Sequence, residues 1–324
     1  MADLAAKKSG IRLSVIIPHY NSTDGMLRML ESIPDEPWIE VLVVDDRSTV
    51  DLSSLQAYVQ KRGERVQLLR NDHENKGAGT ARNIGLSCAR GEWLMFGDAD
   101  DYFVEGWEKI AEGYLDCNAD EIFFPPTSYN IAAKTTGARH RHYEELVLSY
   151  AGHPSQRTQT ELRYGFYTPW SKMVRRSVFT ENDIRFDEQL VANDIMAMTK
   201  AAYYSASIAV DTRAVYCVTC GEKTLTSKKN EANFDTRIDT KIRRYHFLRE
   251  HLSRTEFNQT HFDYYMAGSL ADAAFGKWGM RKLVQVLGKY RRNKIRWMSI
   301  YMFEPSFLFH YIWLDVKWRM ETNG

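Results

Sequence analysis

The stretch LSVIIPHYN at residues 13–21 decides the fold, because a short apolar run there leads directly into a polar turn. Comparable apolar runs lie at residues 41–44, 66–69, 93–96 and 122–124, and helical patterns separate them at residues 26–33, 52–62, 78–89 and 107–115. Apolar strands that alternate with helices predict a mostly parallel sheet with helices on both faces. We therefore expect a Rossmann-like α/β domain whose ligands bind at the carboxyl ends of the strands.

Polar clusters follow three of the first four predicted strands, at residues 18–21 (PHYN), 45–48 (DDRS) and 97–101 (GDADD). A carboxylate leaves the core at a strand end where solvent, a cation or a hydrogen-bond donor receives it. Asp98 and Asp100 are two apart, so in an extended segment they emerge on one face and can share a cation, for which carboxylate oxygens favour Mn²⁺ or Mg²⁺. The alternative interpretation makes Asp98 a turn residue and Asp100 or Asp101 the cap of a helix that begins near Val104.

Composition limits the classes of function. Lys and Arg number 43 against 42 for Asp and Glu, so a net charge of +1 gives no field that would attract nucleic acid. The cysteines are scattered and the first thirty residues lack a leader pattern, which predicts a reducing, cytoplasmic setting. Charged residues and a proline interrupt the apolar stretch 298–316, so we expect no spanning helix. Cys217 and Cys220 lack a second ligand pair and are interpreted as thiols.

Five motifs then occur in order along residues 13–204. They are SVIIPHYN (14–21), VVDDRS (43–48), NKGAGTARNIG (75–85), DAD (98–100) and the downstream set PWSK (169–172), IRFDE (184–188) and ND (193–194). With these motifs the chain resembles the family 2 inverting glycosyltransferases with the GT-A fold, of the bacterial surface-polysaccharide type.

The resemblance implies a UDP-sugar donor and a divalent cation, Mn²⁺ or Mg²⁺. Pro18 and Tyr20 match residues that line the uracil pocket, Asp46 matches one that binds the edge of the base, and aromatic stacking with one acceptor is adequate to select uridine. The metal residues are Asp98 and Asp100. The donor-binding residues are Pro18, Tyr20, Asn21, Asp45, Asp46, Lys76, Gly77, Arg82, Asp98 and Ala99. Packing of Tyr20 against the sheet edge and a structural role for Arg82 remain open.

Inversion needs a base for the acceptor hydroxyl, and Asp194 matches the aspartate that the family uses. The preceding residue is usually Glu in the family and is Asn193 here. A helix cap at Asp194 is the alternative. Trp170 and Lys172 match acceptor-side positions, together with Asn193; Trp170 can equally be a core residue.

Residues 1–10 are expected to be flexible, 11–127 to form the nucleotide-sugar half, 128–230 the acceptor half and 231–324 a helical module. We expect a crossing loop at residues 128–160. No Asp or Glu occurs between residues 273 and 303, where basic residues and aromatic rings alternate. One interpretation is that this segment binds an anionic membrane surface, on the cytoplasmic face of the inner membrane. The other is that it forms a solvated helix face over a core stripe of Leu283, Val286 and Leu287. The basic residues are Lys277, Arg281, Lys282, Lys289, Arg291, Arg292, Lys294 and Arg296.

The expected function is transfer of a hexose or N-acetylhexosamine to a hydroxyl of a glycan or glycolipid acceptor in capsule, O-antigen or lipooligosaccharide synthesis. A non-catalytic nucleotide-sugar-binding protein on the same fold is one alternative. A sugar-phosphate nucleotidyltransferase is another, although its glycine-rich loop follows the first strand, whereas residues 77–82 here follow the third.

Overall fold

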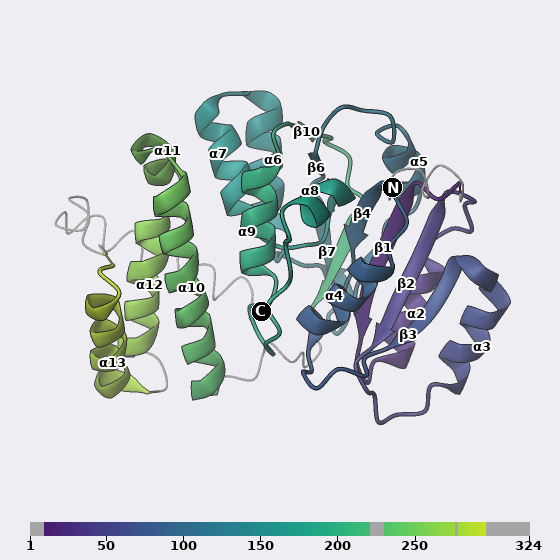
Figure 1. Cartoon of the computed structure of the whole chain (residues 1–324), viewed down its shortest axis with the longest axis horizontal. Coiled ribbons are helices and arrows are strands. Elements are labelled where there is room, and N and C mark those ends of the chain that lie inside the picture. The colour runs from purple at the N-terminus through teal and green to yellow at the C-terminus, as the bar shows by residue number, and fades with distance from the viewer. Residues whose placement is uncertain (1–9, 221–229, 276–277, 296–324) are drawn as a thin grey trace. The chain divides into compact units, whose positions relative to one another are not determined.

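The computed structural model describes residues 10–220, 230–275 and 278–295, and the chain divides into two compact units, residues 1–222 and 223–324 (Figure 1). A seven-stranded sheet forms the centre of the first unit, in the order β10-β6-β9-β4-β1-β2-β3. All its pairings are parallel except those of β9 with β4 and β6, so the mostly parallel sheet is confirmed. The strands are β1 (Leu13–His19), β2 (Ile39–Asp45), β3 (Val66–Arg70), β4 (Trp93–Phe96), β6 (Glu121–Phe123), β9 (Lys172–Arg175) and β10 (Ile208–Val210).

The strand order creates a crevice at the carboxyl end of β1. The chain runs outward from β1 to β2 and β3, and then returns to place β4 on the other side of β1. In the parallel register His19 lies opposite Asp45, and Ile16 lies opposite Phe96. The ends of β1, β2 and β4 therefore lie side by side where the order reverses, which is where open α/β sheets bind ligands.

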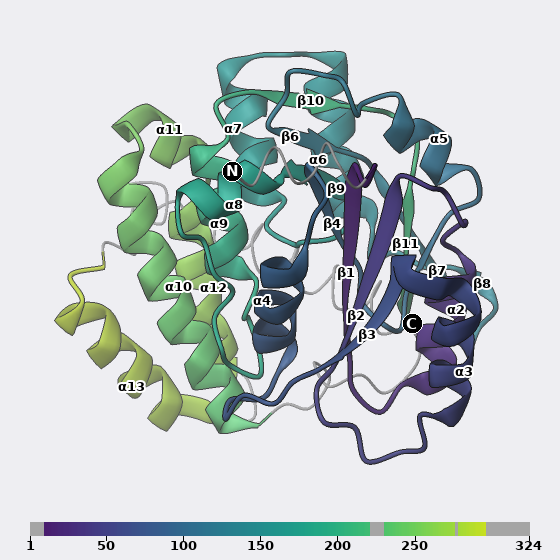
Figure 2. The ribbon, with the colours of Figure 1, turned by 45° about the vertical axis from the view of Figure 1, so that its right-hand side comes forward.

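Helices cover both faces of this sheet (Figure 2). Alternate residues of the strands explain this, because Val15 and Ile17 belong to a core with Met29 of α2, while Ile16 belongs to a second core with Leu86 of α4. Continuous apolar runs are thus needed to fill two faces at once. The helices are α2 (Thr23–Glu31), α3 (Ser53–Arg62), α4 (Ala78–Cys88), α5 (Trp107–Glu112), α8 (Arg176–Glu181) and α9 (Ile195–Tyr204), with a 3₁₀ turn at Gly63–Arg65.

A smaller sheet in the order β5-β11-β7-β8 lies beyond the end of β4. Its central strand β11 carries Cys217 and Cys220, which are free thiols as predicted, like the other two cysteines. Among the described residues no group of three or more His, Cys, Asp and Glu side chains forms a ready metal site. The strands are β5 (Tyr102–Phe103), β7 (Pro126–Asn130), β8 (Thr135–Thr136) and β11 (Tyr216–Cys220).

The predicted crossing loop at residues 128–160 is wrong. After β7 and β8 this segment forms α6 (Arg141–Gly152) and most of α7 (Gln156–Gly165). Each helix buries few apolar side chains, Val147 in α6 and Leu162 in α7, which is why its sequence reads as polar. A capping box starts α7, since the Ser155 hydroxyl accepts a hydrogen bond from the backbone N–H of Thr158.

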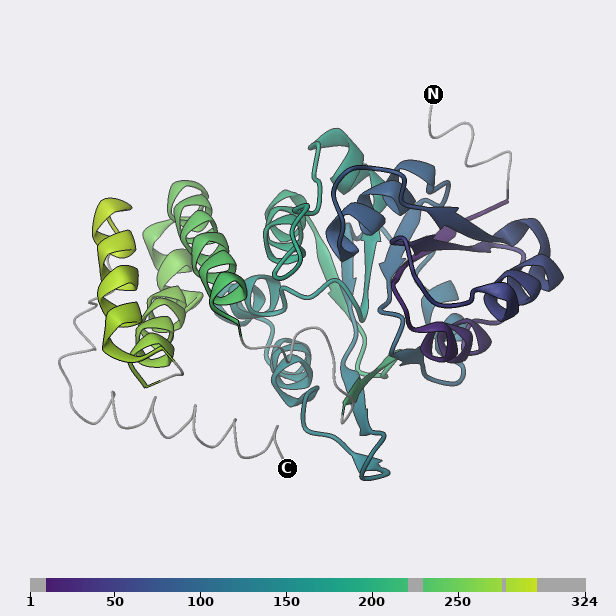
Figure 3. The ribbon, with the colours of Figure 1, turned by 90° about the horizontal axis from the view of Figure 1, so that it is seen from below.

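The second unit is helical, as predicted (Figure 3). It comprises α10 (Glu231–His251), α11 (Arg254–Gln259), α12 (Phe262–Phe275) and α13 (Gly279–Arg292). No helix in the described ranges is long and apolar enough to cross a membrane. The apolar stretch 298–316 lies outside the described residues.

Candidate active site

The ends of β1 and β2 are tied together by a buried carboxylate. Asp45 Oδ1 lies 3.0 Å from His19 Nδ1, and Asp45 Oδ2 accepts a hydrogen bond of 3.1 Å from the Ser48 backbone N–H. Burial raises the pKa of Asp45, but the hydrogen bonds from Ser48 and His19 outweigh it and hold the pKa below its usual value. Asp45 therefore fixes the strand ends to each other as an ionised, structural group.

Asn21 and Tyr20 form the turn after β1. Asn21 has a left-handed backbone, with φ of 51°, and its Oδ1 accepts a hydrogen bond of 2.7 Å from the Thr49 N–H. Tyr20 remains 39% exposed, and Lys76 Nζ lies 5.8 Å from the centre of its ring. Packing of Tyr20 into the sheet edge is thus disfavoured, and an aromatic face beside a cation is available at the crevice.

Asp46 organises the loop that leads into α4. Its Oδ2 accepts a hydrogen bond of 2.7 Å from the Gly77 N–H, and its Oδ1 accepts one of 2.6 Å from Asn71 Nδ2. Gly77 has φ of 121°, a conformation that side chains rarely adopt, and it is the N-cap of α4. Sequence reasoning missed Asn71, which follows β3 and completes the row of polar strand ends.

The loop after β4 gathers three carboxyl groups. Asp101 is buried and accepts hydrogen bonds from the Tyr216 hydroxyl and the Thr219 N–H, at 2.9 and 2.7 Å. Asp98 and Asp100 are partly exposed. Asp98 opens a turn, but neither it nor Asp100 caps a helix, because α5 begins at Trp107 with Gly106 as its N-cap. The helix-cap interpretation of this motif is wrong.

The carboxyl groups of residues 98–101, the acid loop, repel one another. Burial and the neighbouring charge of Asp98 both raise the pKa of Asp100. A divalent ion would relieve this repulsion, and the donor set of carboxylate oxygens suits Mn²⁺ or Mg²⁺.

Arg82 of α4 lies between the acid loop and the start of α9. It is 4% exposed, Nη2 is 2.5 Å from Asp98 Oδ1, and Nη1 donates a hydrogen bond of 2.8 Å to Asn193 Oδ1. Arg82 is therefore a buried residue that connects the acid loop to the segment before α9.

Asp194 follows immediately, in the N-cap position of α9, yet its side chain makes no capping hydrogen bond. Burial raises the pKa of this carboxyl, and the nearby charge of Arg82 opposes the rise. Asp194 is thus a half-buried carboxyl group that makes no capping hydrogen bond and directly follows the partner of Arg82, which makes it a candidate for proton transfer.

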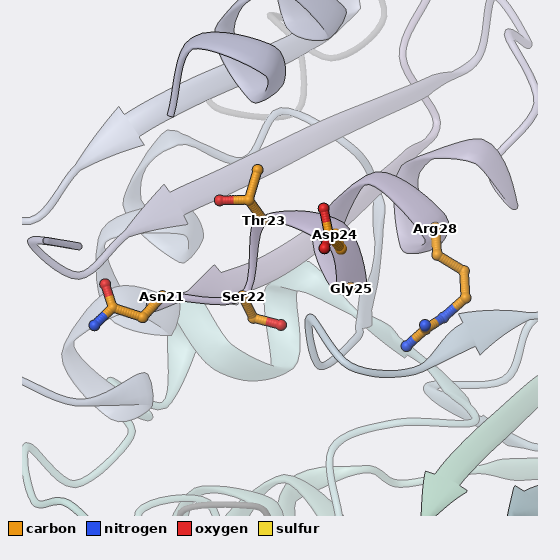
Figure 4. A pocket seen from close by; sticks show the side chains of 6 residues that line it. All are labelled: Asn21, Ser22, Thr23, Asp24, Gly25 and Arg28. Atoms are coloured by element: carbon orange, nitrogen blue, oxygen red, sulfur yellow. The ribbon is translucent and has the colours of Figure 1, made fainter. Parts of the chain in front are cut away.

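A polar hollow of about 260 Å³ lies at the start of α2 (Figure 4). It lies where the β1 turn enters α2, and Arg28 at its end donates a hydrogen bond of 2.5 Å to the backbone oxygen of Asp100. A Cβ on Gly25 would come within 2.7 Å of the Ala99 oxygen, so only glycine lets α2 approach the acid loop this closely. The lining residues are Asn21, Ser22, Thr23, Asp24, Gly25 and Arg28.

Comparison with known proteins identifies the family. The family profile described as Glycosyl transferase family 2 matches residues 14–182, over half of the chain. The chain belongs to glycosyltransferase family 2. Its sequence is 27% identical over 202 residues to the poly(ribitol-phosphate) β-N-acetylglucosaminyltransferase TarS of Staphylococcus aureus, and this match covers 61% of the chain but only 33% of TarS.

Solved structures show the same fold. A crystal structure of S. aureus TarS residues 1–349 in complex with UDP-GlcNAc superposes with a TM-score of 0.64 at 24% identity, covering 87% of this glycosyltransferase and 81% of that chain. A mannosyltransferase from Pyrobaculum calidifontis in complex with GDP-Man and Mn²⁺ gives a TM-score of 0.54 at 17% identity, covering 87% and 75% of the two chains.

Two acceptor-side predictions for this glycosyltransferase need correction. Trp170 is 4% exposed and stacks on Tyr216, with ring centres 5.9 Å apart. Lys172 is fully buried, and its Nζ lies 3.2 Å from Glu121 Oε1. Both side chains belong to the core because β9, which begins at Lys172, is inserted between β4 and β6. We therefore leave them out of the acceptor site.

Some of the basic residues of α13 form ion pairs with acidic residues of α10. Lys282 is 1% exposed and pairs with Glu231 and Asp235 of α10, at 2.9 and 2.7 Å, while Lys289 pairs with Asp239 at 2.7 Å. Of the predicted core stripe, Val286 is buried, whereas Leu283 and Leu287 are half-buried. Arg291, Arg292 and Lys294 are exposed, whereas Lys277 and Arg296 lie outside the described residues.

Proposed function

We propose that this family 2 enzyme transfers a hexose or N-acetylhexosamine from a UDP-sugar to a hydroxyl of a bacterial glycan or glycolipid, with inversion at the anomeric carbon. The observation that carries the proposal is the arrangement at the crevice: two partly exposed carboxylates after β4, an exposed aromatic ring after β1, and Asp194 directly after Asn193, which Arg82 contacts. The TarS complex with UDP-GlcNAc supports a nucleotide-sugar donor on this fold.

Tyr20 and Pro18 would hold the uracil base. The exposed Tyr20 ring offers a stacking face, and Lys76 beside it supplies a positive charge for the nucleotide. Asp46 is committed to Gly77 and Asn71, so its contribution in this proposal is to place the turn that carries Lys76 and Gly77.

Asp98 and Asp100 would hold a divalent cation. The donor set fits, because the two carboxyl groups repel each other and a cation would stabilise both as anions. When bound, such an ion neutralises the charge that develops on the departing diphosphate.

Asp194 would accept the proton of the acceptor hydroxyl. The acceptor oxygen forms a bond to the anomeric carbon while the bond from that carbon to the diphosphate oxygen breaks, and UDP leaves with the electron pair. An acceptor oxygen that attacks from the side opposite the leaving group, while the base takes its proton, gives inversion in one step. Burial raises the pKa of Asp194 towards the range in which a carboxylate is an effective base.

The test is release of UDP from UDP-GlcNAc, UDP-glucose or UDP-galactose in the presence of Mn²⁺ and polyol-phosphate or oligosaccharide acceptors. We expect Asp194→Asn to lower kcat by about 10²- to 10⁴-fold. Asp116→Asn is the matched control, because the Asp116 side chain is 91% exposed and pairs with Arg12 close to the start of β1. UDP binding without turnover would favour a non-catalytic binding protein, and full activity of Asp194→Asn would remove the base assignment.

We further propose that α13 contacts an anionic bilayer. Met280 and Val284 are 68% and 62% exposed, one turn apart, and the same helix ends with exposed Arg291 and Arg292. The variant Arg291→Glu/Arg292→Glu should lose sedimentation with phosphatidylglycerol vesicles, while neither form should sediment with phosphatidylcholine. Equal sedimentation of both forms with the anionic vesicles would contradict the proposal.

A further inference from the structure

The guanidinium of Arg82 joins two segments that are far apart in sequence. One arm contacts Asp98, sixteen residues away at the end of β4, and the other contacts Asn193, 111 residues away in the segment that enters α9. Arg82 and Asn193 are both buried, and the guanidinium also lies over the Phe186 ring, 5.5 Å from its centre. A planar, forked cation held on three sides has very little freedom to move.

The same helix holds the rest of that segment. Asn83 exchanges two hydrogen bonds with the backbone of Phe186, at 2.8 and 2.9 Å. The Asn193 backbone oxygen accepts a hydrogen bond of 2.9 Å from the Asp187 N–H. The segment 186–193 is therefore hydrogen-bonded to α4 at both of its ends, and Asp194 is the next residue in the chain.

The amide of Asn193 suits this arrangement better than a second carboxylate would. Asn193 Oδ1 accepts from Arg82 without a charge of its own, while Nδ2 donates to the Gln189 backbone oxygen at 3.3 Å. A carboxylate here would compete with Asp98 for the single charge of Arg82. With an amide, the ion pair between Arg82 and Asp98 stays intact while the other arm is still fixed.

We propose that Arg82 and Asn193 form one bridge that sets the spacing between Asp98 and Asp194. Arg82 and Asn193 are therefore positioning residues. This inference rests on the proposed transfer reaction and adds the device that aligns its two halves. Misplacement of reacting groups by about 1 Å can cost about 100-fold in rate, so the bridge acts mainly on kcat.

A double-mutant cycle tests whether the two residues act as a unit. We expect Arg82→Lys to lower kcat about 100-fold, because lysine keeps the charge but loses the fork. Asn193→Ala should lower kcat about 10- to 100-fold, which corresponds to one lost hydrogen bond to a charged group. The kcat of the double variant should be no lower than that of the less active single variant, and the KM for the donor should change little. If the fold-losses of kcat in the two single variants multiply in the double variant, or if Arg82→Lys keeps the wild-type kcat, the proposal is overturned.

Hydrogen exchange gives a readout that needs no turnover. In both single variants without any ligand, backbone amides of residues 186–194 should exchange at least about tenfold faster than in the wild type. Asn193→Asp keeps the acceptor oxygen for Arg82 but loses the Nδ2 donor and adds a charge, so its exchange rate should lie between those of Asn193→Ala and the wild type. This comparison carries the test alone if Arg82→Lys does not fold. Arg90→Lys is the matched control, since Arg90 pairs with Glu40 near the amino ends of the strands. Unchanged exchange in Asn193→Ala would overturn the bridge, whereas absence of turnover in the wild type would overturn only the transferase proposal.

Discussion

Gly79 of α4 has no room for a side chain, and replacing it by alanine is a sharp test of how the catalytic segment is held. A Cβ at this position would lie 2.0 Å from the Asp187 backbone oxygen and 3.0 Å from both the Asp187 carbonyl carbon and Asn193 Cβ. Ordinary van der Waals contact begins at 3.4 Å. The neighbouring atoms are mostly backbone, so the segment that leads to Asp194 has to move away from α4 by about 1 Å or more.

Two magnitudes follow from this displacement. Overpacking of this kind costs about 1 to 3 kcal/mol of unfolding free energy, and the better helix propensity of alanine offsets up to about 1 kcal/mol. The protein should thus remain folded. A shift of about 1 Å in the position of the base should lower kcat about 100-fold, so that the loss of activity greatly exceeds the loss of stability.

The assay is UDP release for kcat, with urea unfolding of the same preparation for stability. Gly113→Ala is the control, because Gly113 has φ of −61° and its added Cβ would meet only the Ile110 and Lys109 backbone oxygens, at 3.4 and 3.9 Å. Wild-type kcat in Gly79→Ala, with stability unchanged, would refute the reasoning that α4 fixes the segment before α9.

Three further outcomes are expected. Tyr20→Ala should weaken UDP binding in calorimetry by about 1 to 3 kcal/mol while Tyr20→Phe retains it, and equal affinities for all three proteins would exclude stacking. Because burial raises the pKa of Asp194, its ionisation costs folding free energy once the pH exceeds 3.8; Asp194→Asn should therefore be more stable than the wild type at pH 7 but not at pH 3, as measured by thermal unfolding. Lys172→Ala should lose about 3 to 5 kcal/mol of stability, because it leaves the Glu121 carboxylate without this partner in the core. The fraction that folds should keep its affinity for UDP, and a stable variant that binds UDP more weakly would instead place Lys172 in the nucleotide site.

The sheet and its ligand edge could be predicted because buried parallel strands have a simple sequence pattern. The runs that became β1, β2 and β4 are buried on both faces, and a polar cluster follows each of them at the edge where ligands bind. Strand β9 had no such pattern, because it begins with a lysine that pairs with Glu121 on the neighbouring strand β6. Its antiparallel place in the sheet therefore could not be predicted locally.

Several residues of the candidate site could be named from the sequence, but the contacts that join them could not. Asp98, Asp194 and Arg82 could be named from motifs, yet the contact of Arg82 with Asn193 spans 111 residues and leaves no local signal. Asn71 was missed because a single asparagine after a strand reads as an ordinary turn residue. Trp170 illustrates the opposite error. Its place in the PWSK motif suggested an acceptor-side role, whereas its packing against Tyr216 makes it part of the core.

The most direct measurement is a crystal structure of the full chain with UDP and Mn²⁺, using the anomalous signal of manganese to locate the ion. The account predicts a peak within about 2.5 Å of carboxylate oxygens of Asp98 and Asp100, in contact with the diphosphate and with uracil on Tyr20. A nucleotide bound elsewhere, or manganese coordinated away from both aspartates, would contradict it.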